Sequence, residues 1–174
     1  MKIHNQSLSI SPTDLSNFLS CRYRSALDLS AAQGVRKKPV RNNPVIETLM
    51  ELGLEHEREY VRRLEQSATT VLNLDAVQNR ELALKKTDEA IRAGVDVIVQ
   101  AALSHGSWYG RPDILLKVSK NGTKLGAWCY DPVDAKLARE TRGGTIMQLG
   151  LYCELLDKIQ GQAPEWFHVV APGP

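Results

Sequence analysis

The chain has 174 residues, 43% of which are hydrophobic, so it can form one domain with a substantial core. Its formal net charge of +2 excludes a strongly basic protein, so any nucleic-acid-binding surface must be local. The most apolar stretch is too short to span a membrane, and three scattered cysteines favour a reducing cytosol over a disulfide framework. We expect a single cytoplasmic domain over residues 1–174.

The first predicted helix begins at Ser11-Pro12-Thr13-Asp14, with Ser11 as N-cap, Pro12 at the first position and Asp14 in the first turn. It should end before Gly34. Basic residues gather on this helix and in the loop after it, opposed only by Asp28: Arg22, Arg24, Arg36, Lys37, Lys38 and Arg41. This basic group is either an ordinary solvated surface or a track for a phosphate backbone.

A second helix is predicted from Pro44 to Gln66. Its apolar residues recur at helical spacing and form an inward stripe: Leu49, Leu52, Tyr60 and Leu64. His56 completes this stripe at intervals of three and four, so we expect its side chain to point inward. Such a histidine is either a hydrogen-bonded core residue or a ligand.

Shorter elements follow the second helix. We expect a strand from Thr70 to Leu74 and a helix from Lys85 to Ala93 that ends at Gly94. The β-branched run Val95 to Gln100 predicts a strand. A loop containing His105, a solvated polar residue with no assigned role, leads on to a hairpin.

The hairpin, residues 110–138, is the most informative stretch. Two apolar runs, 110–118 and 126–137, flank Lys120-Asn121-Gly122-Thr123, and Asn-Gly between such runs is a strong hairpin signal. Because side chains alternate along a strand, Asp134 and Lys136 share one face, whereas Val133, Ala135 and Leu137 share the other.

Antiparallel pairing of the two strands would bring Asp113 beside Asp134. Two converging carboxylates bind a hard divalent cation, and Lys136 could then orient or deprotonate the attacking water. The alternative is a surface hairpin that carries an Asp134/Lys136 pair on its solvated face.

A last helix is predicted from Thr145 to Ile159, with a buried apolar stripe: Leu149, Tyr152, Leu155, Leu156 and Ile159. Gln148 lies on this stripe four residues before Tyr152. Either Gln148 bonds a neighbouring backbone group, or both side chains point at a polar site. A strand over residues 166–170 closes the series, which predicts an α/β domain with a mixed central sheet flanked by helices.

These residues resemble, in order and type, the PD-(D/E)XK nuclease superfamily: His56, Pro112-Asp113, Asp134-x-Lys136 and Gln148-x-x-x-Tyr152. The helix-borne histidine and the Q-x-x-x-Y helix are similar to the RecB-like branch, which also contains CRISPR-associated exonucleases. Residues 11–21 and 134–140 look closer still to bacterial RecB-family nucleases, some of which are fused to helicases. The resemblance covers nearly the whole chain and implies a restriction-endonuclease-like core.

The resemblance also implies roles for individual residues. His56, Asp113 and Asp134 would be metal ligands, joined by the carbonyl of Ala135 or Val133, and Lys136 would be the catalytic lysine. Gln148 and Tyr152 would position the substrate or the polar network. The implied cofactor is Mg²⁺ or Mn²⁺, and an imidazole ligand favours Mn²⁺. The implied substrate is DNA, as single strands or duplex ends, in repair, recombination or defence.

The chain departs from the family in one respect. Some RecB-like nucleases bind an iron–sulfur cluster through one early cysteine and three after the Q-x-x-x-Y helix. Cys21 matches the first position, but only Cys153 follows Tyr152, so we predict no cluster in this chain. The chain would be a stand-alone nuclease or one shortened at its C-terminus.

Two other functions remain open from the sequence alone. One is a non-catalytic nucleic-acid-binding module with the same fold, and the other is a fragment whose activity needs a helicase partner. The choices between DNA and RNA, and between exonuclease and endonuclease, also remain open.

Overall fold

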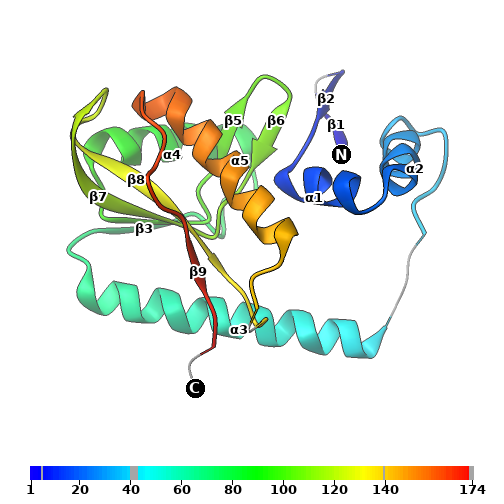
Figure 1. The fold of residues 1–174 in the computed structure, drawn as a ribbon, viewed down its shortest axis with the longest axis horizontal. Helices are drawn as coiled ribbons and strands as arrows, with labels where there is room; N and C mark the ends of the chain where they lie inside the picture. The colour runs from blue at the N-terminus through cyan, green and yellow to red at the C-terminus, as the bar shows by residue number, and fades with distance from the viewer. Residues whose placement is uncertain (5, 40–42, 139, 173–174) are drawn as a thin grey trace.

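A mixed β-sheet lies at the centre of the computed structural model, which describes residues 1–4, 6–39, 43–138 and 140–172. Neighbouring strands pair in the order β3-β4-β7-β8-β9 (Figure 1). The β4/β7 and β7/β8 pairs are antiparallel, and the β3/β4 and β8/β9 pairs are parallel. The strands are β3 (Val71–Asn73), β4 (Val97–Val99), β7 (Ile114–Thr123), β8 (Gly126–Ala135) and β9 (His168–Val170).

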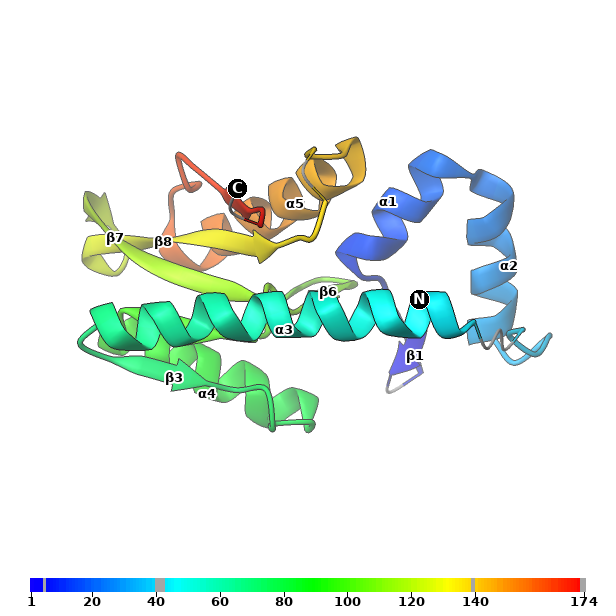
Figure 2. The same ribbon diagram turned by 90° about the horizontal axis from the view of Figure 1, so that it is seen from below.

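Helices cover both faces of this sheet, which confirms the predicted mixed α/β architecture. α3 (Pro44–Ser67) crosses one face, and α4 (Arg80–Ala93) and α5 (Gly143–Gln160) pack on the other (Figures 1 and 2). The larger core lies under α4 and α5, and its fully buried members include Ile91, Ile98, Leu115, Tyr130, Leu149 and Leu156. The smaller core lies under α3: Val61, Val97, Val99, Ile114 and Val133. Within the described ranges, no helix is both long enough and apolar enough to cross a bilayer.

The inward stripe predicted for α3 is correct only for its C-terminal half. Val61 is buried against the sheet, and Tyr60 and Leu64 pack beside it. Leu49 and Leu52, in contrast, are 55% and 53% exposed. With 24 residues the helix is roughly 36 Å long, so its N-terminal half extends past the sheet (Figure 2).

The predicted N-terminal helix is two helices, α1 (Pro12–Ser20) and α2 (Arg22–Ala32). Its predicted start is confirmed, because Ser11 and Asp14 form a capping box. Cys21 breaks the helix with an extended backbone (φ −161°, ψ 103°). α1 packs against α5, and Ser16 Oγ donates a hydrogen bond of 2.8 Å to the Gly144 carbonyl. After the break at Cys21, α2 runs away from α5 (Figure 1).

Two small antiparallel hairpins were not predicted. β1 (Lys2–His4) pairs with β2 (Ser7–Ser9), and β5 (Leu103–His105) pairs with β6 (Trp108–Gly110). The predicted loop around His105 is therefore partly strand. The predicted strand over residues 110–118 is also divided, because β6 ends at Gly110 and β7 begins only at Ile114.

The turn of the central hairpin lies later than predicted. Thr123 pairs with Gly126, so Lys124 and Leu125 form the turn, and Thr123 Oγ1 accepts a 3.1 Å hydrogen bond from the Leu125 amide. The Asn-Gly signal is instead part of an irregular stretch of β7, in which Gly122 has φ +81°. Gly122 therefore supplies the positive φ that a bulge needs, and Gly126, with φ +112°, follows the actual turn.

Candidate active site

Asp113 and Asp134 lie side by side at one end of the β7/β8 pair. The register pairs Ile114 with Val133, so the residue before Ile114 faces the residue after Val133. The Ala135 amide donates a 3.0 Å hydrogen bond to Asp113 Oδ2 and fixes that carboxyl group at the end of β8. The structure therefore brings the two predicted carboxylates together. Ala135, expected to contribute its carbonyl oxygen, contacts Asp113 through its backbone N–H.

The two carboxyl groups are in a poorly solvated place. Burial raises the pKa of Asp113 to about 7, and the negative charges of Asp134 and Glu57 act in the same direction. The Asp134 side chain is 2% exposed, and its Oδ1 accepts a 2.7 Å hydrogen bond from Lys136 Nζ. Its Oδ2 is buried and has no hydrogen-bond partner among the described residues. A cation at this oxygen would satisfy it.

Lys136 connects this buried pair to solvent. Its side chain is 37% exposed, while its Nζ contacts Asp134 Oδ1. Its backbone N–H donates a 2.9 Å hydrogen bond to the Val170 carbonyl, which fixes the end of β8 against β9. Because Asp134 is buried, the alternative of an Asp134/Lys136 pair on a solvated face does not describe this hairpin.

Gln148 and Tyr152 approach the same carboxylates from α5. Tyr152 is 3% exposed, and burial together with the charges of Asp113 and Asp134 raises the pKa of its hydroxyl well above the usual value. The hydroxyl therefore stays protonated and can donate a hydrogen bond. A hydrogen bond with the Gln148 side chain acts in the opposite direction and lowers the pKa of Tyr152. The predicted apolar stripe of α5 is buried as expected at Leu149, Leu155 and Leu156.

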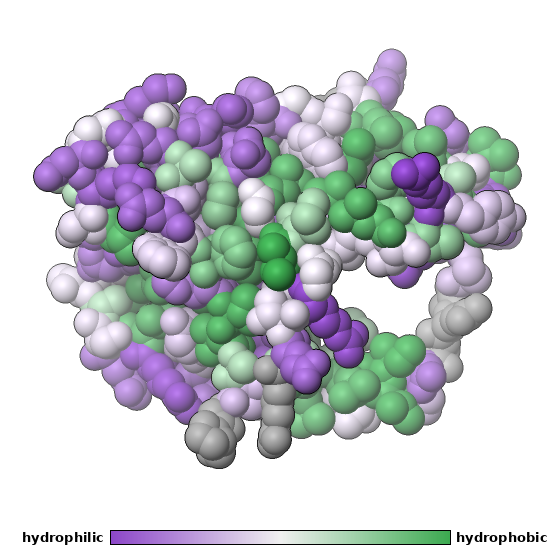
Figure 3. Space-filling view, viewed as in Figure 1, coloured by the Kyte–Doolittle hydropathy of each residue, from purple (hydrophilic) through white to green (hydrophobic). Residues whose placement is uncertain are grey.

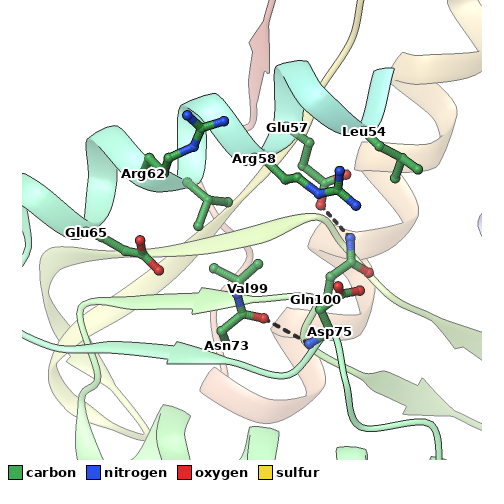
Figure 4. A pocket seen from close by; sticks show the side chains of 10 residues that line it. Leu54, Glu57, Arg58, Arg62, Glu65, Asn73, Asp75, Val99 and Gln100 are labelled. Atoms are coloured by element: carbon green, nitrogen blue, oxygen red, sulfur yellow. Dashed lines mark hydrogen bonds between the residues drawn. The ribbon is translucent and has the colours of Figure 1, made fainter. Parts of the chain in front are cut away.

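His56 does not join the carboxylates. Its Nε2 lies 2.9 Å from the carbonyl oxygen of Val170, so its ring is held against β9. The next residue, Glu57, approaches instead: its Oε1 accepts a 2.7 Å hydrogen bond from Gln100 Nε2, and its charge contributes to the raised pKa of Asp113. Figure 4 shows Glu57 reaching from α3 toward Gln100, on the wall of a cavity of about 420 Å³.

Gln100 and Arg111 hold the backbone around Asp113, and neither was predicted. Gln100 has φ +52°, a left-handed conformation that is uncommon for a residue other than glycine, and its N–H donates a 2.7 Å hydrogen bond to the Asp113 carbonyl. The Arg111 guanidinium donates to the carbonyls of Gln100, Leu74 and Val77 at 2.7–3.1 Å. These contacts hold residues 111–113, which lie between β6 and β7.

The donor set fits Mg²⁺ or Mn²⁺ through Asp113 and Asp134, with Asp134 Oδ2 as the oxygen that lacks a partner. Among the residues that the structure describes, no three His, Cys, Asp or Glu side chains are gathered closely enough to hold a metal without other ligands. Mg²⁺ commonly binds through one or two carboxylates and takes its remaining ligands from water and substrate phosphates. A pair of carboxylates is therefore sufficient for such a site.

The described members of the basic group lie on and after α2, on the opposite side of α1 from the sheet (Figure 1). Lys38 and Arg24 approach Asp28 at 3.4 and 3.9 Å, and the Arg22 guanidinium lies 5.5 Å from the centre of the Phe18 ring. Arg36 and Lys37 are exposed in the following loop. Arg41 lies outside the described residues.

Comparison with known proteins supplies no identity for the chain: no protein-family model and no curated protein matches it. A functional assignment therefore rests on the residues of this site and on their geometry.

Proposed function

We propose that this protein is a Mg²⁺- or Mn²⁺-dependent DNA nuclease of the PD-(D/E)XK type with a restriction-endonuclease-like core. One observation carries the proposal: Asp134 Oδ2 is buried beside Asp113 and has no hydrogen-bond partner among the described residues. A buried carboxylate oxygen without a partner is costly, so a fold that keeps it beside a second carboxylate is suited to bind a cation there.

The residues of the site have distinct roles in this proposal. A bound Mg²⁺ or Mn²⁺ would supply Lewis-acid charge at the scissile phosphate. Asp113 and Asp134 hold the ion, and Lys136, which is partly exposed, donates a hydrogen bond to the attacking water or to the phosphate. Tyr152 and Gln148 donate hydrogen bonds that position the substrate, because the Tyr152 hydroxyl remains protonated.

The position of Lys136 favours catalysis over simple binding. A module that only binds nucleic acid needs exposed cations, whereas Lys136 contacts a carboxylate that is almost completely buried. An ammonium group at the boundary between solvent and the ligand carboxylate is well placed for hydrolysis of a phosphate that binds from the solvent side. Single strands and duplex ends remain the proposed substrates.

A cleavage assay tests this proposal. End-labelled single-stranded and duplex DNA are incubated with the purified protein in Mg²⁺, in Mn²⁺ or in EDTA. We expect cleavage only with a metal ion, and a loss of at least about a hundredfold in Asp134→Asn and in Lys136→Ala. Asp131→Asn is the matched control, because Asp131 is also buried in β8 but contacts His168.

Two results would contradict the proposal. One is the absence of cleavage in every metal condition, and the other is a wild-type rate in Asp134→Asn. Equal losses in Asp131→Asn and Asp134→Asn would show damage to β8 and would also count against a specific role for Asp134.

A further inference from the structure

A second cavity, of about 550 Å³, is lined by Gln148 and Tyr152 of α5 and by the N-terminal segments. This volume is within the range of ligand-binding cavities, roughly 300–1,000 Å³. Its walls come from β1, β2, α1, α4, β6 and α5 and include Lys2, Ser9, Arg80, Tyr109, Gln148 and Tyr152. Gln148 and Tyr152 therefore face this cavity and also lie beside the candidate metal site.

The charges of the cavity favour an anionic ligand. Lys2, Arg80 and Arg111 line it, and Asp14 is the acidic residue in the lining. Asp14 Oδ2 is already engaged by the Ser11 amide at 2.8 Å, by Ser11 Oγ at 2.7 Å and by the Met1 amino group at 2.6 Å. Within the described ranges, neither Lys2 nor Arg80 forms an ion pair.

Arg80 is held in position for such a ligand. Its Nη1 donates a 2.9 Å hydrogen bond to Ser9 Oγ, and its guanidinium carbon lies 4.1 Å from the centre of the Tyr109 ring. A guanidinium has five N–H donors, so most of them remain for other acceptors. Arg111 differs, because its guanidinium is already bonded to three backbone carbonyls.

A fixed guanidinium, an aromatic ring and a second cation are the groups that bind a nucleotide, through its phosphate and its base. We propose that this cavity holds one nucleotide of the bound strand. Its phosphate lies at Lys2 and at the edge of the Arg80 guanidinium, and its base stacks on the guanidinium face that Tyr109 supports from the other side. The inference rests on the proposed function, because the neighbouring scissile phosphate then lies at Asp113 and Asp134, which are close to Tyr152.

Binding in EDTA tests the cavity without cleavage. The anisotropy of a short, labelled oligothymidylate is titrated with wild-type protein, Arg80→Ala and Tyr109→Leu. We expect each variant to bind about tenfold more weakly, since a charge-assisted hydrogen bond or a base stack is lost. Arg92→Ala is the matched control, because Arg92 lies on the same helix and pairs with Asp88, and it should bind like wild type.

A further variant separates the charge of Arg80 from its geometry, and two competitors separate the base from the phosphate. Arg80→Lys keeps the positive charge and should recover part of the affinity, and thermal melts verify that each variant folds. Thymidine monophosphate should displace the oligonucleotide at lower concentration than inorganic phosphate, because the base also contributes. Equal displacement by the two competitors would overturn the base contact.

The other outcomes are also decisive. Wild-type affinity in both Arg80→Ala and Tyr109→Leu would overturn the proposal. Binding of thymidine monophosphate that depends on Arg80, combined with oligonucleotide binding that does not, would make the cavity a free-nucleotide site and would overturn the strand assignment. Arg80-dependent oligonucleotide binding by a protein that cleaves nothing would refute the proposed hydrolysis and leave the cavity assignment intact.

Discussion

Asp113 is half-buried and has negatively charged neighbours, Asp134 and Glu57. Burial raises its pKa to about 7, whereas an aspartate in an unfolded chain titrates near 4. The folded state therefore binds the proton more tightly than the unfolded state does. The stabilisation from this group is complete below about pH 4 and is lost as the pH rises through about 7.

This difference predicts how stability depends on pH. In EDTA, the free energy of unfolding should fall between pH 5 and pH 8, with a contribution from Asp113 of no more than about 3 kcal/mol. Asp113→Asn cannot ionise and should show a smaller fall. Urea denaturation of wild type and of Asp113→Asn at pH 5 and at pH 8 measures the fall in unfolding free energy of each protein. An identical fall in both would show that Asp113 titrates normally.

Gly110 gives a second test at the residue scale, because it lies where β6, α1 and α5 meet. A Cβ there would lie 2.7 Å from Tyr152 Cε1 and 2.8 Å from Pro12 Cδ. We expect Gly110→Ala to lower the free energy of unfolding by about 1–3 kcal/mol through overpacking. Gly150→Ala is the matched control in α5, since a Cβ at Gly150 has no described neighbour within 4 Å.

The control variant, Gly150→Ala, should instead have a higher free energy of unfolding than wild type. Replacing a helical glycine by alanine stabilises a helix by roughly 0.5–1 kcal/mol. Thermal or chemical denaturation compares the two variants. A Gly110→Ala protein as stable as wild type would contradict the close packing of Tyr152.

Sequence reasoning placed Asp113 beside Asp134 because strand alternation and antiparallel pairing depend on short-range patterns. The resemblance assigns the helix-borne ligand to His56, but the structure holds this ring at the Val170 carbonyl. The next residue, Glu57, bonds Gln100 and adds negative charge near Asp113. Adjacent helical residues point about 100° apart. Which of them faces the carboxylates depends on how α3 is rotated against the sheet, and that rotation is set by packing rather than by the sequence of α3 alone.

At the scale of elements, α3 shows what a hydrophobic pattern does and does not predict. Its start at Pro44 and its approximate length follow from the sequence. The boundary between its buried and exposed halves does not, because β3 and β4 are only three residues long and the sheet ends before the helix does. The exposed half carries the large apolar side chains Val45, Ile46, Leu49 and Met50, and Figure 3 shows apolar surface over this end of α3.

The two halves of α3 should therefore respond differently to the same kind of substitution. We expect Val61→Ala to cost about 1–3 kcal/mol of unfolding free energy, because Val61 packs under the sheet. Leu49→Ala should cost less than about 0.5 kcal/mol, since Leu49 is 55% exposed. Urea denaturation of both variants measures the difference. Equal costs would mean that the N-terminal half of α3 is also covered in solution.

The short hairpins were missed for a similar reason. The strands β1, β2, β5 and β6 have three residues each, which is too few for an alternating pattern to be recognised. The long β7/β8 hairpin was recognised, but its turn was placed at the Asn-Gly pair rather than at Lys124 and Leu125. A glycine with positive φ can belong to a bulge as well as to a turn, and the sequence does not separate these two cases.

At the scale of the whole molecule, the alternation of helices and strands was sufficient to predict a mixed sheet between helical layers. The relation between the basic group and the carboxylates was not predictable, because the break at Cys21 redirects α2 away from α5 (Figure 1). Asp28 also approaches both Arg24 and Lys38, which leaves less free positive charge on this surface than the sequence suggests.

The basic group remains a prediction as a phosphate-binding track. If its residues contact phosphates, the combined Lys37→Ala and Lys38→Ala variant should weaken DNA binding and lower its salt slope by about 0.7–0.9 per lost contact. Lys85→Ala on α4, which pairs with Glu89, serves as the control. Binding curves at several salt concentrations measure the slope. An unchanged slope would assign these lysines to the solvated surface.

The most direct test of the proposed metal site is anomalous diffraction from crystals grown with Mn²⁺ at about pH 8, roughly one unit above the pKa of about 7 that burial gives Asp113. The expected result is a single strong anomalous peak that marks a Mn²⁺ ion coordinated by Asp134 Oδ2 and by an Asp113 carboxyl oxygen. Crystals of Asp134→Asn should show no such peak. A wild-type map without a peak between these two carboxylates, or with one at His56 instead, would contradict the assignment of Asp113 and Asp134 as the metal ligands.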